Sequence, residues 1–207
     1  MKIVSTNYSY TVEHSLGLSY YSENYNIGYI PIPKCGSTFF KNYFNTSLNF
    51  KQIHLSENNF NKKFIVIIRH PFQRWISGIS KFVELYNSRN PVRINLEDEA
   101  LVDLLCHQLI FDPHTSPQTM FLNNIDTDDC IFLKIDSPTF TNDINNFLST
   151  LDVNIKFPNY NDEKHKNTSD YSHVKAIFTE KFKTFRYMSH FRQVFAKDYD
   201  LYKFVAS

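Results

Sequence analysis

Residues 29–41 constrain the fold more than any other part of the sequence. A short apolar run ends at Pro33, a tight polar loop follows, and an amphipathic pattern begins at Ser37. This order predicts a strand, a loop and the N-terminus of a helix. The first turn of a helix has backbone N–H groups without partners and carries partial positive charge, so an anion is its natural ligand.

The side chains of this loop are suited to an anion with phosphate-like charge. Lys34 supplies a full positive charge, Gly36 allows a ligand to approach the backbone, and Ser37 and Thr38 offer hydroxyl donors. Cys35 could have a lowered pKa at a helix N-terminus, but a small residue in a tight loop is the simpler interpretation. The loop is therefore predicted to bind a phosphate-like group.

Strand-like and helix-like patterns alternate along the chain. Apolar runs predict strands over residues 27–32, 50–55, 64–68 and 131–135, and helical spacing predicts helices from residue 37, over 71–86 and 96–111, after residue 143, and in the last 35 residues. This alternation predicts one three-layer α/β domain over residues 1–207 with a mainly parallel central sheet. Residues 1–26 are predicted to form an edge strand or a lid.

Three candidate ligand-binding residues directly follow or end predicted strands. They are Lys34, His54 and Arg69. Ligands of parallel sheets bind outside the C-terminal ends of the strands, so this placement favours a common site. On the helix after Arg69, the side chains of Arg74 and Lys81 lie along one flank, where a solvated surface and a role in the site are equally consistent with the pattern.

Composition argues against several other classes of protein. The formal net charge is +1, so bulk charge predicts neither a nucleic-acid nor a membrane partner. Cys35, Cys106 and Cys130 lack the spacing of a zinc site or a disulfide framework. No apolar run approaches the ~20 residues that span a bilayer, and the first residues do not resemble a signal peptide. We therefore expect a cytoplasmic protein without a membrane span.

The lysine loop differs from two common phosphate-binding motifs. A Walker A loop has its lysine after the second glycine, whereas Lys34 precedes Gly36 and no glycine lies at the required upstream position. A cysteine-dependent phosphatase would have an arginine six positions after its cysteine, where this chain has Lys41. An ordinary ATPase, GTPase or phosphatase is therefore disfavoured.

Two motifs resemble those of the Golgi-type carbohydrate sulfotransferases. Residues 33–38, with sequence PKCGST, resemble the family's 5′-phosphosulfate loop, and residues 69–77 resemble its 3′-phosphate segment R-x-P-x-x-R-x-x-S. Weaker similarity extends through His114-x-x-Pro117-Gln118 and through residues 131–151, 167–169 and 198–202. One motif alone would be weak, but the ordered pair is specific.

The resemblance implies a P-loop-like sulfotransferase fold and 3′-phosphoadenosine 5′-phosphosulfate (PAPS) as the donor, with no metal. Lys34 and the backbone of residues 35–38 would hold the 5′-phosphosulfate, and Arg69 and Ser77 would hold the 3′-phosphate. The acceptor would be a hydroxyl of a glycan or a similar molecule. Lys164, His165 and Lys166 are equally consistent with a loop that closes over the nucleotide and with a solvated basic loop.

Transfer to a hydroxyl needs a general base. His54 is the first candidate because it ends a strand between the two donor motifs, and related enzymes often carry the base there. His114 is the second candidate and Glu57 the third. Two alternatives remain open, a nucleotide-dependent kinase of related topology and a homologue that binds the nucleotide without catalysing transfer.

Overall fold

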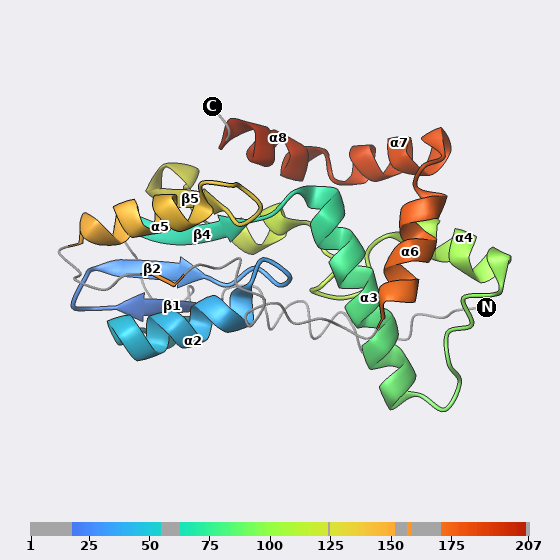
Figure 1. Ribbon diagram of the computed structural model, residues 1–207, viewed down its shortest axis with the longest axis horizontal. Coiled ribbons are helices and arrows are strands. Elements are labelled where there is room, and N and C mark those ends of the chain that lie inside the picture. Colours follow the sequence, from blue (N-terminus) through green and yellow to red (C-terminus); the bar gives the residue numbers. More distant parts are fainter. Residues whose placement is uncertain (1–17, 55–62, 124, 152–156, 159–170, 206–207) are drawn as a thin grey trace.

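The computed structural model describes residues 18–54, 63–123, 125–151, 157–158 and 171–205. Its centre is a five-stranded sheet with the strand order β3-β1-β2-β4-β5 (Figure 1). The strands are β1 (Leu18–Ser22), β2 (Ile27–Ile30), β3 (Lys51–His54), β4 (Lys63–Ile68) and β5 (Cys130–Lys134).

The sheet is mixed, so the predicted mainly parallel sheet is not confirmed. β2 pairs with β4 and β4 with β5 in parallel, but β1 is antiparallel to both β2 and β3. The cause is a tight hairpin between β1 and β2, in which Asn26 has a φ of 48° and accepts a 2.7 Å hydrogen bond from the Tyr21 hydroxyl. β1 therefore lies inside the sheet, with a neighbour on each side.

Helices cover the sheet and form a second body beside it. Within the described residues they are α2 (Ser37–Leu48), α3 (Pro71–Arg89), α4 (Glu99–Gln108), α5 (Phe140–Ser149), α6 (Ser172–Lys181), α7 (Phe185–Val194) and α8 (Ala196–Phe204), with the short 3₁₀ helices η2 (Gln118–Leu122) and η3 (Thr127–Asp129). In Figure 1, α2 runs beside β1 and β2, whereas α3, α4 and α6 gather away from the sheet. None of the helices in the described ranges is long and apolar enough to cross a membrane.

Two aromatic-rich cores stabilise these two parts. The first lies between the sheet, α2 and α5, where Phe40 and Phe44 are completely buried. The second lies among α3, α4, α6 and α7, and at its centre the Trp75 indole N–H donates a 2.7 Å hydrogen bond to the Leu109 carbonyl. α8 touches both cores, because Tyr202 packs on the first and Tyr199 on the second.

The elements around the candidate site begin close to the predicted positions. α2 starts at Ser37, and α3 starts at Pro71, whose missing N–H is tolerated in a first turn. β2 ends at Ile30, two residues earlier than predicted, because Pro31 has no N–H with which to continue the ladder. Each loop that carries a predicted donor motif therefore runs from the end of a sheet strand to the N-terminus of a helix.

Candidate active site

The two donor-motif loops lie side by side at one edge of the sheet. β2 and β4 are parallel, with Ile30 opposite Val66, so the loops that follow them leave at the same edge. The Arg69 guanidinium Nη1 lies 3.5 Å from the Lys34 carbonyl oxygen and donates to it. The structure thus brings the Lys34 loop and the Arg69 segment together, although they are 35 residues apart in the sequence.

The backbone conformation of the Lys34 loop leaves the first turn of α2 without a side-chain cap. Lys34 has a φ of 67°, which is costly for a residue with a side chain, and Gly36 has a φ of 73°. A Cβ on Gly36 would also lie 2.7 Å from the Phe40 ring and 2.9 Å from Ile135. Gly36 is the N-cap residue and has no side chain with which to cap the helix, so the first N–H groups of α2 are suited to an external anion.

The charge around Lys34 also favours an anion. Burial is the largest cause that lowers the pKa of Lys34, and together with the positive charges of Lys81 on α3, Lys175 on α6 and, to a smaller extent, Arg69 it brings that pKa to about 8. The Glu84 carboxylate opposes this shift. Several cations from separate elements therefore act on one half-buried lysine, and a bound anion would relieve their mutual repulsion.

The Arg74 side chain of α3 supports the Lys34 loop through a hydrogen bond to its backbone. This side chain is completely buried, so a solvated flank is the wrong interpretation for this residue. Its Nε donates to the Pro33 carbonyl at 2.9 Å, Nη2 donates to the Pro113 carbonyl at 3.2 Å, and Nη1 donates to the Ser116 carbonyl. One planar guanidinium thus joins α3, the Lys34 loop and residues 113–116. Lys81, by contrast, is partly exposed and pairs with Glu84 at 2.5 Å.

Gln118 joins the two donor loops through its side-chain amide. Its Oε1 accepts hydrogen bonds from the Arg69 N–H at 2.9 Å and from the Cys35 thiol at 3.3 Å, and its Nε2 donates to the Arg69 carbonyl at 2.9 Å. Burial raises the pKa of the Cys35 thiol to about 12. Cys35 is therefore a protonated structural residue in this loop, as its small size suggested.

A buried carboxylate from α8 fixes Gln118 in turn. Asp198 accepts from the backbone N–H of Gln118 at 2.7 Å, from the N–H of Thr119 at 3.0 Å and from the Thr119 hydroxyl at 2.8 Å. These contacts cap η2 at its N-terminus. Asp198 is 1% exposed, so the C-terminal helix is tied to the donor loops through buried hydrogen bonds.

Two of the three candidate bases lie within the described residues. His54 ends β3 opposite Leu18, two strands away from β2 and so roughly 10 Å from it across the sheet. It lies at the same edge as the donor loops. Glu57 lies outside the described residues, as do Lys164, His165 and Lys166.

His114 has a carboxylate partner that sequence reasoning missed. Its Nδ1 lies 2.7 Å from Asp112 Oδ2, and Asp112 is 3% exposed. The same carboxylate accepts from the backbone N–H of His114 and of Thr115. A carboxylate on Nδ1 fixes the proton there and leaves Nε2 as the atom that can accept one. The His114 backbone packs on Gly78, next to Ser77 in α3.

His70 begins α3 and is also held by a carboxylate. It is the N-cap residue, and its backbone N–H donates to Asp136 Oδ2 at 2.8 Å. The Tyr202 hydroxyl donates to the other oxygen of Asp136 at 2.9 Å. Asp136 and Asp198 fall within the segments of weaker family similarity, and Asp112 falls outside them. No spacing pattern assigned a hydrogen-bond partner to any of the three, which is why the sequence did not indicate their roles.

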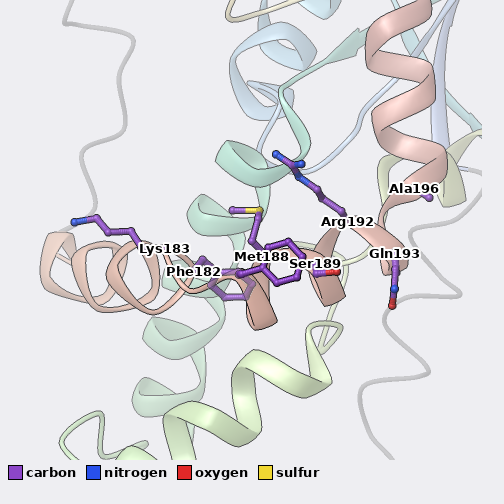
Figure 2. Close-up of a pocket in the computed structure, with 8 residues that line it drawn as sticks. Phe182, Lys183, Met188, Ser189, Arg192, Gln193 and Ala196 are labelled. Carbon is purple, nitrogen blue, oxygen red and sulfur yellow. The ribbon is translucent and has the colours of Figure 1, made fainter.

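A separate groove lies along α7, from the turn that follows α6 to the first residue of α8 (Figure 2). Its volume is about 570 Å³, and Met188 and Arg192 are among its lining residues. In Figure 2 the labelled side chains come from the α7 region and the turns beside it. None of the predicted donor or base residues lines this groove, so it is distinct from the candidate active site.

The mixed sheet of this α/β fold thus carries a lysine-bearing loop at a helix N-terminus with a second cationic segment beside it, an arrangement that is suited to an anionic ligand. The sequence profile of the Sulfotransferase family matches residues 19–205. The chain therefore belongs to the sulfotransferase family. No curated protein and no solved structure matches it.

Proposed function

We propose that this protein transfers a sulfuryl group from PAPS to a hydroxyl group of a glycan or similar acceptor. The observation that carries the proposal is the meeting of the two donor motifs, in which Arg69 reaches the Lys34 carbonyl at 3.5 Å. Membership of the sulfotransferase family supports sulfuryl transfer as the reaction class. PAPS carries negative charge at both ends of the nucleotide, and this edge of the sheet offers two cationic loops.

The donor would be held at two points. Lys34 and the first N–H groups of α2, with the hydroxyls of Ser37 and Thr38, would bind the 5′-phosphosulfate. Arg69 would bind the 3′-phosphate through its planar fork, and the Ser77 hydroxyl would add a donor two helical turns further along α3. Cys35 and Gly36 would contribute backbone rather than side-chain groups, because Cys35 is buried and protonated.

The reaction would be an in-line displacement at sulfur. The acceptor oxygen forms a bond to sulfur while the bond between sulfur and the 5′-phosphate oxygen breaks, and the base takes the acceptor's proton. The electron pair of the broken bond stays on the phosphate, so negative charge grows there. Lys34 would stabilise that charge, and the rigid loop would pre-align the donor.

His54 is the proposed general base, because β3 ends at the donor edge of the sheet. His114 is the second candidate, supported by the Asp112 carboxylate that would orient its ring. Glu57 is the third candidate.

The test begins with binding of the desulfonated product, 3′-phosphoadenosine 5′-phosphate (PAP), and with transfer from labelled PAPS to a panel of sugars, phenols and peptides. We expect Lys34→Ala and Arg69→Ala each to abolish transfer and to weaken PAP binding. Lys63→Ala, at the exposed start of β4 on the opposite edge of the sheet, is the matched control and should change neither. Normal turnover in both site variants would overturn the proposal.

Two further outcomes separate the alternatives. Binding of ATP in preference to PAP would favour a kinase. Tight PAP binding without transfer to any member of the panel would favour a nucleotide-binding homologue that has lost catalysis.

A further inference from the structure

The Arg69 peptide group has an unusual hydrogen-bond partner. In a strand, successive residues direct their N–H and C=O groups to opposite sides. The Ile68 carbonyl accepts from the Ile135 N–H at 2.9 Å, on the β5 side of β4. The N–H and C=O of Arg69 therefore face the other side, where β2 would continue if it were longer.

β2 cannot supply these partners. It ends at Ile30, and the chain then leaves the extended conformation, because the Ile32 carbonyl accepts from the Cys35 N–H at 3.2 Å and Lys34 has a φ of 67°. The side-chain amide of Gln118 takes the place of the missing strand. It accepts from the Arg69 N–H and donates to the Arg69 carbonyl, each at 2.9 Å.

We propose that Gln118 is a positioning residue that sets the separation between the Lys34 loop and the Arg69 segment, the two arms of the donor site, and that Asp198 holds Gln118 in place. This inference rests on the proposed PAPS-binding function. The same Gln118 oxygen accepts a 3.3 Å hydrogen bond from the Cys35 thiol in the Lys34 loop, so one carboxamide contacts both arms. Asp198 fixes the start of η2 by accepting the Gln118 N–H at 2.7 Å.

Removal of the Gln118 carboxamide would mainly displace Arg69, the residue that is proposed to bind the 3′-phosphate. Without the carboxamide the partly buried N–H and C=O of Arg69 lose both partners, so the peptide would shift to find others and would take the guanidinium with it. The Lys34 loop would remain supported by Arg74, which binds the Pro33 carbonyl. The 5′-phosphate contacts should therefore change less than the contact with the 3′-phosphate.

The ratio of two affinities tests this directly. PAP has a 3′-phosphate and adenosine 5′-monophosphate (AMP) does not, so the preference for PAP over AMP reports the Arg69 arm. We expect Gln118→Met, which keeps the side-chain length and removes the hydrogen bonds, to lower this preference about tenfold while AMP affinity falls less than about threefold. Asp198→Asn loses one acceptor and should change the preference in the same direction by a smaller factor.

The control is Ser22→Ala, which removes a buried 2.8 Å hydrogen bond to the Leu48 carbonyl at the opposite end of β1. It should leave the preference unchanged even if the protein is less stable. A general loss of stability lowers the amount of folded protein and weakens PAP and AMP binding equally, so only a positioning role changes the ratio. The KM for the acceptor should also stay unchanged in Gln118→Met.

The outcomes distinguish this inference from the proposed function. If the wild-type protein does not prefer PAP to AMP, the PAPS-binding function itself fails. If the wild type prefers PAP and folded Gln118→Met retains that preference, the positioning role is wrong. Should Gln118→Met not fold, Asp198→Asn decides in the same way, because it weakens the hold on the Gln118 N–H and leaves the Gln118 side chain unchanged.

Discussion

The Nε atom of Arg74 donates a hydrogen bond to the carbonyl oxygen of Pro33 across 2.9 Å. This bond joins the first turn of α3 to the loop that carries Lys34. Because Arg74 is completely buried, its charge is compensated by the carbonyl groups around it rather than by water. The position of the donor loop therefore depends on a residue that has no contact with solvent.

Replacing Arg74 with lysine should destabilise the protein. A lysine keeps the charge but has no planar fork, so it cannot reach the carbonyls of Pro33, Pro113 and Ser116 together. Buried carbonyls would lose their partners, and we expect a loss of about 3 kcal/mol in the free energy of unfolding, measured by urea denaturation. The exposed Arg93→Lys is the control and should stay within about 0.5 kcal/mol. Equal stability of the two variants would contradict this role of Arg74.

Gly78→Ala should destabilise the protein, although alanine is the better helix former. In an exposed helix the change would gain about 1 kcal/mol. Here the added Cβ would lie 2.1 Å from the His114 carbonyl oxygen and 2.7 Å from its carbon, and a backbone segment cannot rotate away as a side chain can. We expect a net loss of about 2 kcal/mol on urea denaturation.

Ser80→Ala is the control for Gly78→Ala, because it lies in the same helix and is also buried. Its hydroxyl donates only to the Ile76 carbonyl within α3, at 3.1 Å, so its loss should cost less than about 1 kcal/mol. A Gly78→Ala protein as stable as the wild type would mean that residues 112–118 do not pack on α3 as closely as the structure has them.

Local sequence patterns predicted many of the strands and helices, but few of the long-range contacts that hold the loops of the candidate site. β4, α2 and α3 were predictable because five apolar residues in a row, helical spacing and Pro71 at a helix start each act within a short segment. The place of β1 inside the sheet depends on pairing with β3, which no local pattern encodes. The link between Gln118 and Asp198 spans 80 residues, so no spacing rule could reveal it.

The affinity for PAP should fall as the pH rises through 8. The protonated form of Lys34 binds the anion, and the pKa of Lys34 in the free protein is about 8. Binding of an anion raises that pKa, so above pH 8 a proton must be taken up on binding and affinity is lost. We expect the dissociation constant to increase about tenfold between pH 7 and pH 9 at constant ionic strength, as measured by calorimetry.

Lys34→Arg is the control for this pH dependence. Arginine stays protonated throughout this range, so the variant should bind PAP with an affinity that does not change between pH 7 and pH 9. A wild-type affinity that is constant over the same interval, or an equal slope in the variant, would show that Lys34 is not the titrating group.

The two histidines that are candidates for the general base, His54 and His114, should differ in their effect on transfer. We expect His54→Ala to lower kcat about 10²-fold or more while the PAP dissociation constant is unchanged, because a base touches the acceptor and not the nucleotide. His114→Gln should keep most of the activity if the role of the His114–Asp112 pair, with its 2.7 Å contact, is to fix the loop at residues 112–118. The measurement is single-turnover transfer from labelled PAPS at saturating donor. A fully active His54→Ala together with an inactive His114→Gln would move the base to His114, whose Nε2 is the proton acceptor that Asp112 leaves available.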